Sequence, residues 1–344
     1  MVRIKRKFGA DQICIPSLPV FLALQGAGRR RSKRKRVEYS GKMLYLCISN
    51  AVQTDKHQIM ETSNHTLYPH TCGPIGIFDS GYGGLTIAAE TIKRLPQYDF
   101  VYLGDNARAP YGTRSYQVVY DFTLQAVKKL FEMGCRLIIL ACNTASAKAL
   151  RTIQQEDLPK MNLPHRRVLG IIRPTVEALG DITVTNQIGI LGTEGTVSSN
   201  SYPLEVAKLF PDIEVFQEAC PLWVPIVETG ESNSPGADFF IRKHLDNILE
   251  KGERIDTIVL ACTHYPLLLP KIKRLVTPTL KIVSQGELVA ASLENYLLRH
   301  PEIEQNLSKE GSVTYYTTES EEKFASKASI FMEQAITAHH LDLD

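Results

Sequence analysis

The sequence predicts an α/β fold: two similar doubly wound domains with mostly parallel sheets facing a central cleft, preceded by a disordered N-terminal extension. Three observations lead to this prediction. From Pro74 onward, short apolar runs alternate with helical stretches, which is typical of parallel sheets covered on both faces. Two pairs of these runs resemble each other, at offsets of 113 and 120 residues. Residues 1–70 lack the alternation and are strongly basic at their start.

The predicted strands are short apolar runs that end at turn residues. They cover Ile75–Phe78, Phe100–Leu103, Leu137–Ala141, Val168–Ile172, Ile188–Leu191, Ile213–Phe216 and Thr257–Leu260. The run with the weakest strand pattern is Ile213–Phe216, because the charged Glu214 interrupts it. A helical stretch after the first strand ends at Leu95. Ser115 can cap the next helix, which Gly134 stops. The third strand is followed by a helix that we expect to run through Leu150.

Composition indicates a globular protein whose cysteines are in the reduced, free-thiol state. The chain of 344 residues is 44% hydrophobic and 22% charged, which is enough to bury a core in about two domains. It has no apolar run of about 18 residues, so we expect no transmembrane helix and no membrane partner. The seven cysteines do not form close pairs. This spacing argues against a disulfide framework and a metal site, and favours free thiols in a cytoplasmic compartment.

The charge is unevenly distributed along the chain. The formal net charge is +2, from 39 Lys and Arg against 37 Asp and Glu. Residues 1–42 hold 12 bases and 2 acids, which leaves 27 bases and 35 acids for the rest. The main body is therefore mildly acidic, and its charge gives no support for binding nucleic acid or a membrane.

Residues 1–73 read as an appendage to the folded protein. An apolar stretch at 13–23 precedes a dense basic block at 29–36, and Met43 and Met60 are alternative starts. We interpret the segment as a disordered extension. A targeting presequence and a nucleic-acid-binding arm are the two alternatives, because basic runs of this length occur in both.

Cys142 and Cys262 are the most informative residues. Each follows an apolar strand and precedes small polar residues, and their flanking sequences are similar. A cysteine at a strand-to-helix turn has a lowered thiol pKa when it lies near the helix N-terminus. Two inert buried cysteines are the alternative. One thiol in each half suits two-base racemisation, in which one group removes a proton from a carbon and the other delivers one to the opposite face.

Polar residues near these strand ends could tune the thiols. Asp79 and Ser80 end the first strand, and His264 lies two residues after Cys262. Nearby, Gly81–Gly84 is glycine-rich but is not a full dinucleotide-binding fingerprint, and the chain has no Walker-type phosphate loop.

Several strings of this sequence occur in the same order in one enzyme family. They are GIFDSGYGGL (76–85), YLGDNARAPYGTRS (102–115), ACNTAS (141–146), LGTEGTVSSNSY (191–202), ACPLWVPIVETGE (219–231) and DTIVLACTHYPLL (256–268). Across residues 75–285 the chain resembles the glutamate racemase family. The resemblance implies a cofactor-independent racemase that interconverts L- and D-glutamate and supplies D-glutamate for peptidoglycan.

The resemblance also implies a role for each site residue. Cys142 would act on the Cα hydrogen of D-glutamate and Cys262 on that of L-glutamate. Asp79 would assist Cys142, and Glu228 with His264 would assist Cys262. The substrate-binding residues implied by the family are Asp79, Ser80, Tyr111, Gly112, Asn143, Thr144, Thr263 and His264. Backbone N–H groups and hydroxyls of such residues can bind carboxylates in a cleft that excludes water.

The family fold implies a discontinuous first domain. We expect residues 74–167 and 284–344 to form it and residues 168–283 to form the second, with a small-molecule substrate between them. The sequence leaves a homodimer open. An aspartate racemase with the same two cysteines is the alternative enzyme, and a racemase-like protein whose basic arm binds nucleic acid is the alternative from another class.

Overall fold

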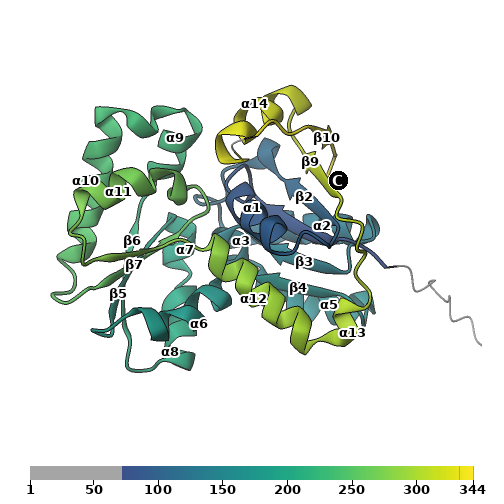
Figure 1. The fold of residues 1–344 in the computed structure, drawn as a ribbon, viewed down its shortest axis with the longest axis horizontal. Coiled ribbons are helices and arrows are strands. Elements are labelled where there is room, and N and C mark those ends of the chain that lie inside the picture. Colours follow the sequence, from purple (N-terminus) through teal and green to yellow (C-terminus); the bar gives the residue numbers. More distant parts are fainter. Residues whose placement is uncertain (1–71, 333, 344) are drawn as a thin grey trace, which may run out of the picture. The chain divides into compact units, whose positions relative to one another are not determined.

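A six-stranded parallel sheet includes the C-terminal end of the chain (Figure 1). The computed structural model describes residues 72–332 and 334–343, which belong to one compact unit. The strand order is β10-β9-β2-β1-β3-β4. The strands are β1 (Ile75–Asp79), β2 (Phe100–Gly104), β3 (Leu137–Leu140), β4 (Arg167–Gly170), β9 (Val313–Thr317) and β10 (Ala338–His340).

A second parallel sheet has four strands in the order β6-β5-β7-β8. They are β5 (Gln187–Gly192), β6 (Glu214–Ala219), β7 (Thr257–Ala261) and β8 (Lys281–Val283). This order repeats the β2-β1-β3-β4 part of the first sheet, strand for strand. The resemblance between the sequences of β1 and β5, and between those of β3 and β7, therefore reflects equivalent places in two similar sheets.

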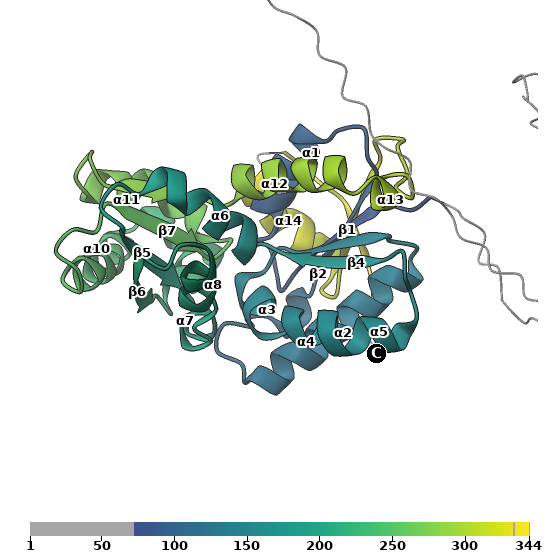
Figure 2. The same cartoon turned by 90° about the horizontal axis from the view of Figure 1, so that it is seen from below.

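Helices cover both faces of the first sheet (Figure 2). On one side lie α1 (Leu85–Arg94), α12 (Gly286–Arg299) and α14 (Glu321–Met332), with α12 packed on α1. On the other side lie α2 (Tyr116–Glu132), α3 (Asn143–Lys148), α4 (Leu150–Thr152) and α5 (Leu158–Met161). A π-helical segment η2 (Ile153–Asp157), a 3₁₀ turn η1 (Asn106–Arg108) and α13 (Pro301–Glu304) complete this part.

The second sheet is covered in the same way. Figure 1 shows α9 (Trp223–Glu228), α10 (Pro235–Leu249) and α11 (Leu269–Leu275) on one side. On the other side are α6 (Ile172–Ile182), α7 (Glu194–Ser198) and α8 (Ser201–Leu209). Two 3₁₀ turns, η3 (Glu231–Asn233) and η4 (Tyr265–Leu268), follow α9 and β7. The prediction of an α/β fold with doubly wound parallel sheets is confirmed.

Each sheet has one place where the direction of winding reverses. The chain leaves β1 for β2 on one side and then crosses to β3 on the other, so the reversal lies between β1 and β3. In the second sheet it lies between β5 and β7. Ligands of doubly wound sheets bind outside the carboxyl ends of the strands at this point. Cys142 follows β3 and Cys262 follows β7, so each sheet brings one thiol to its own reversal point.

All seven predicted strands are present, but some boundaries and elements differ. The strand expected over Val168–Ile172 ends at Gly170, because Ile172 begins α6. The division into two domains stays a prediction; residues 167 and 168, between which we expect the boundary, both lie in β4, which pairs with β3. The helix expected to end at Leu150 continues in short helical segments to Met161. Sequence analysis missed β8, β9 and β10, of which β8 and β10 have only three residues each. The extension predicted for residues 1–73 lies outside the described residues, except for its last two.

The C-terminal helix α14 is anchored in the core by aromatic contacts. Phe324 is fully buried, and its ring lies 5.5 Å from that of Tyr82 and 6.3 Å from that of Tyr102, measured between centroids. Tyr102 belongs to β2, and Tyr82 lies in the loop after β1. Burial of such rings contributes strongly to core stability, so α14 is an integral part of the first sheet's packing.

Phe324→Ala should destabilise the fold by about 3–5 kcal/mol, because it removes a buried ring and leaves a cavity among Tyr82 and Tyr102. The measurement is the free energy of unfolding in urea. Phe239→Ala is the matched control, since Phe239 is 64% exposed, and it should change the free energy by no more than about 0.5 kcal/mol. Equal effects of the two substitutions would contradict the packing described for α14.

Candidate active site

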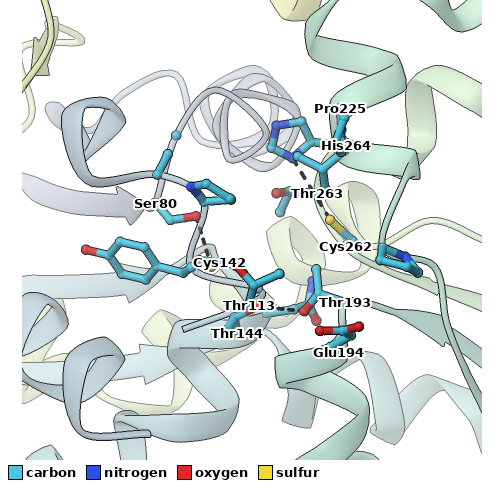
Figure 3. A pocket seen from close by; sticks show the side chains of 18 of the residues that line it. Ser80, Thr113, Cys142, Thr144, Thr193, Glu194, Pro225, Cys262, Thr263 and His264 are labelled. Atoms are coloured by element: carbon cyan, nitrogen blue, oxygen red, sulfur yellow. Dashed lines mark hydrogen bonds between the residues drawn. The ribbon is translucent and has the colours of Figure 1, made fainter. Parts of the chain in front are cut away.

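Residues from the carboxyl ends of both sheets line a single pocket (Figure 3). Every predicted site residue except Asp79 lies on its wall. These residues are Ser80, Tyr111, Gly112, Cys142, Asn143, Thr144, Glu228, Cys262, Thr263 and His264. Sequence positions nearly 200 residues apart thus meet because parallel strands present their carboxyl ends at one edge of each sheet.

Cys142 stands at the start of α3 and contacts residues of the first sheet. Its Sγ lies 3.4 Å from the hydroxyl of Ser80 and accepts a hydrogen bond from the backbone N–H of Ala145 at 3.5 Å. The side chain caps the helix, as the turn after β3 predicts. Cys142 is only 6% exposed, and what it exposes faces the pocket.

Cys262 lies on the opposite side of the pocket, in a strand-end position that matches that of Cys142 (Figure 3). It is also 6% exposed. Its Sγ is 4.0 Å from Nδ1 of His264, whose Nε2 is 2.9 Å from a carboxylate oxygen of Glu228. Glu228 ends α9, so a helix and a strand end of the second sheet together form the series Cys262, His264, Glu228. This bonding fixes the orientation of the imidazole ring.

Burial raises the pKa of both thiols. Burial, and next the nearby Asp79 charge, raise the pKa of Cys142 to about 11, although hydrogen bonds from Ser80 and Ala145 oppose the shift. The pKa of Cys262 is raised further, mainly by burial, and a charge on Cys142 adds to the effect. The lowered pKa expected near a helix N-terminus is therefore wrong, because loss of hydration outweighs the helix N–H groups. Since a charge on Cys142 disfavours a charge on Cys262, the pocket favours at most one thiolate at a time.

Asp79 lies beneath the pocket wall instead of on it. The residue is fully buried, and one carboxylate oxygen accepts the backbone N–H of Gly81 at 2.9 Å. The other oxygen, Oδ1, is buried without a hydrogen-bond partner among the described residues. Burial raises the pKa of this carboxyl group, while the charge of His264 opposes the shift. Asp79 can therefore influence the protonation of Cys142 without lining the pocket.

The glycine-rich loop after β1 allows the two sheets to approach closely. A Cβ atom on Gly83 would lie 2.3 Å from Oγ1 of Thr263 and 2.4 Å from Nδ1 of His264. A Cβ atom on Gly84 would lie 2.3 Å from Cβ of Asp79. No side chain fits at such distances. Gly83 therefore permits the loop to contact Thr263 and His264 of the second sheet. Gly84 permits the loop to pack against Asp79 at the end of β1.

Tyr111 and Gly112 belong to a loop that closes the pocket from the first sheet. The Tyr111 hydroxyl donates a short hydrogen bond to Asp105, which also accepts from Arg108 Nε at 2.7 Å. The carbonyl of Gly112 accepts the N–H of Gly195 at 2.7 Å, which joins this loop to α7. The tyrosine side chain is thus used to anchor the loop.

Sequence reasoning missed other residues on the wall, including Thr193, Glu194 and Cys220. The sequence does carry a signal for Thr193, because this residue matches Ser80 when β1 and β5 are aligned by their similar sequences. Its hydroxyl lies 2.9 Å from that of Thr144, a contact between the two sheets' ends. Cys220 is a third thiol at the pocket, and only the fold brings it there.

The charge of the wall restricts what the pocket can hold. Glu194 and Glu228 bring acidic groups to the wall. Burial opposes ionisation of Glu228, but its bond to His264 keeps the pKa of this carboxyl lowered. No lysine or arginine is among the described residues that line the pocket. Such a wall attracts an ammonium group, and it can bind carboxylates only through neutral donors such as hydroxyls, amides and backbone N–H groups.

Comparison with known proteins identifies the family. Residues 86–291 match the family model described as Asp/Glu/Hydantoin racemase. Over 273 residues, 76% of this chain, the sequence is 38% identical to the glutamate racemase of a Ruegeria species, of which the match covers 98%. The chain belongs to the glutamate racemase family. The glutamate racemase of Geobacter metallireducens is another relative, 39% identical over 71% of this chain and 87% of its own length.

Solved structures of glutamate racemases have the same fold. A glutamate racemase isoform of Bacillus anthracis matches 79% of this chain and 98% of its own, with 33% identity and a TM-score of 0.71. The glutamate racemase of Francisella tularensis, solved in complex with D-glutamate, matches 79% of this chain and 97% of its own, with 31% identity and a TM-score of 0.68.

Two further findings concern the described part of this family member. Its five described cysteines are all free. No helix within residues 72–332 or 334–343 is long and apolar enough to cross a membrane.

Alkylation of Cys142 by iodoacetamide should be slow at pH 7 and rise about tenfold per pH unit up to about pH 10, because only the thiolate reacts and its fraction follows the raised pKa. Rates are measured for the Cys142 peptide by mass spectrometry. The same peptide in urea-unfolded protein is the control, and its rate should level off at a lower pH. A plateau below pH 8 in the folded protein would contradict the effect of burial.

Proposed function

We propose that this protein interconverts L- and D-glutamate without a cofactor, with Cys142 and Cys262 as the two bases. The observation that carries the proposal is the pair of buried thiols on opposite sides of one pocket, in a chain whose relatives are named glutamate racemases. A substrate carbon between the thiols would present one face to each, as inversion by proton transfer requires.

The proposed reaction moves one proton off the Cα atom and another onto it. With D-glutamate, the Cys142 thiolate takes the Cα proton and becomes a thiol. The Cys262 thiol then donates its proton to the other face of the planar carbanion and becomes a thiolate, which gives L-glutamate. The reverse direction exchanges the roles. Release of one proton and uptake of another through solvent restore the starting protonation.

The raised thiol pKa values serve this chemistry. At a pKa of about 11, the thiolate of Cys142 is present in about one molecule in ten thousand at pH 7, a cost of about 5 kcal/mol. The same shift makes the thiolate a stronger base, which suits a weakly acidic carbon. Because a charged Cys142 opposes ionisation of Cys262, the partner stays protonated as the acid.

The assisting groups differ between the two sides. We propose that Asp79 assists Cys142 from beneath the wall, where burial favours its protonated form. On the other side, His264 assists Cys262 and is oriented by Glu228. We propose that substrate carboxylates are bound by Ser80, Asn143, Thr144 and Thr263 and by the backbone of Tyr111 and Gly112. These residues line the pocket and bring neutral donors to it.

We further propose a role in supplying D-glutamate for bacterial peptidoglycan, in the cytoplasm. The support for the role is the resemblance to the glutamate racemases. The free thiols of the described cysteines suit the reducing conditions of that compartment.

Purified protein without added cofactor should racemise glutamate from either enantiomer, and aspartate much more slowly. Cys142→Ser and Cys262→Ser should each lower kcat/KM more than about a thousandfold, or about 4 kcal/mol, because a hydroxyl ionises far less readily than a thiol. The loss must be the same in both directions, since enantiomers have an equilibrium constant of one. Initial rates are followed by circular dichroism from each enantiomer.

Cys135→Ser is the matched control, because Cys135 is a buried free cysteine that does not line the pocket. It should lose activity only in proportion to lost folding. A folded variant of Cys142 or Cys262 that keeps more than about a tenth of the wild-type turnover has lost less than about 1.4 kcal/mol, and this would refute the two-thiol mechanism.

A further inference from the structure

Four buried polar side chains form a hydrogen-bonded network behind the pocket. Asn143, Thr175, Tyr202 and Gln285 are each at most 2% exposed. They come from α3, α6 and α8 and from the residue before α12. Of the four, Asn143 alone lines the pocket. The network therefore connects the pocket wall to helices of both sheets.

We infer that Gln285, itself held by Thr175 and Tyr202, is a positioning residue that fixes the side-chain amide of Asn143 and leaves one N–H of that amide for a substrate carboxylate. This inference rests on the proposed function. It concerns residues to which the resemblance assigned no role, since Thr175, Tyr202 and Gln285 were not among the predicted site residues.

The direction of each hydrogen bond follows from the hydroxyl of Thr175. This hydroxyl donates to the carbonyl of Ile171 at 2.7 Å, so its oxygen can only accept from Gln285 Nε2, which is 2.8 Å away. Gln285 Nε2 also donates to the hydroxyl oxygen of Tyr202 at 2.9 Å. With its nitrogen held on that side, Gln285 presents its oxygen Oε1 to Asn143. A reversed amide would place an acceptor against Thr175, whose proton is already used.

The orientation of Asn143 follows in turn. Its Nδ2 donates to Gln285 Oε1 at 2.7 Å. Its Oδ1 accepts from the Tyr202 hydroxyl at 2.8 Å and lies 3.3 Å from Gln285 Nε2. The Tyr202 hydroxyl is therefore the main donor to Oδ1, since the two N–H groups of Gln285 already serve Thr175 and Tyr202, and one of the two N–H groups of Asn143 is used. The second N–H is the polar group that Asn143 can still offer, and a donor in this place suits a carboxylate.

The network has a direct bearing on the reacting groups, because Asn143 is the residue next to Cys142. Hydrogen bonds that join several buried side chains restrict the movement of each of them. Gln285 therefore constrains the start of α3, where Cys142 lies, against Thr175 and Tyr202 of the second sheet's helices. Loss of the hydrogen bonds of Gln285 should weaken substrate binding, because the free N–H of Asn143 is then no longer held in place.

The test is a double-mutant cycle of Gln285→Met and Asn143→Ala, with kcat and KM for glutamate measured in both directions. Gln285→Met keeps the length of the side chain and removes both polar atoms. Alone, it should raise KM by about tenfold and change kcat less, as expected for a lost binding group. In the Asn143→Ala background, it should change kcat/KM by less than about twofold, because Gln285 acts through Asn143.

Tyr202→Phe provides a second variant that removes only one hydroxyl, in case Gln285→Met folds poorly. It should raise KM in the same way. Tyr98→Phe is its matched control: this hydroxyl also donates to a single side chain, Glu304 at 2.9 Å, and Tyr98 does not line the pocket. The control should leave KM unchanged. Melting temperatures of all variants separate loss of folding from loss of binding.

The possible results distinguish this inference from the proposed function. The inference would be overturned if the losses of kcat/KM in Gln285→Met and Asn143→Ala multiply in the double variant. It would also be overturned if folded Tyr202→Phe has an unchanged KM. In either case the racemase activity stands. A wild-type protein that does not racemise glutamate would refute the proposed function instead. The crystal structure of Gln285→Met tests the positioning without activity: we expect the Asn143 amide to lose its single orientation, and an unchanged amide would overturn the inference.

Discussion

Burial of two thiols against one pocket is the constraint on which the rest of this structure depends. Each sheet must bring a cysteine to its own reversal point, and the two reversal points must face each other closely enough to exclude water. The repeated strand order meets the first requirement. Gly83 helps to meet the second, because a side chain there would collide with Thr263 and His264 of the second sheet. The same burial raises both thiol pKa values, and a charge on Cys142 disfavours a second charge on Cys262.

The polar groups around the thiols follow from that burial. A pocket with acidic side chains and without lysine or arginine on its described wall holds an ammonium group readily and leaves carboxylates to neutral donors. Neutral donors must be held in fixed orientations to bind well, since they lack the long range of a charge. The loop anchored by Tyr111 on Asp105, and the network of Gln285 around Asn143, provide such fixation. Substrate recognition would thus depend on residues one layer behind the wall.

Much of this arrangement could be predicted from the sequence, for identifiable reasons. The strands β1, β3, β5 and β7 are clear apolar runs in the sequence. The cysteines that follow β3 and β7 have similar neighbouring residues. The short strands β8 and β10 have too few residues for a pattern. The pKa shifts could not be foreseen, because the position at a helix N-terminus suggests a lowered value and only the fold reveals the burial. Gln285 lies far from the cysteines in sequence, and only the packing of α12 brings it to Asn143.

The most direct test of the two-base account is racemisation of L-glutamate in D₂O, analysed at low conversion by mass spectrometry of the separated enantiomers. Thiol protons exchange with solvent, so the second thiol should deliver deuterium. The account predicts that the D-glutamate formed carries deuterium at Cα from the first turnovers, while the remaining L-glutamate carries none. D-glutamate that retains the original proton, or deuterium that accumulates in L-glutamate, would indicate a single base serving both faces and would contradict the account.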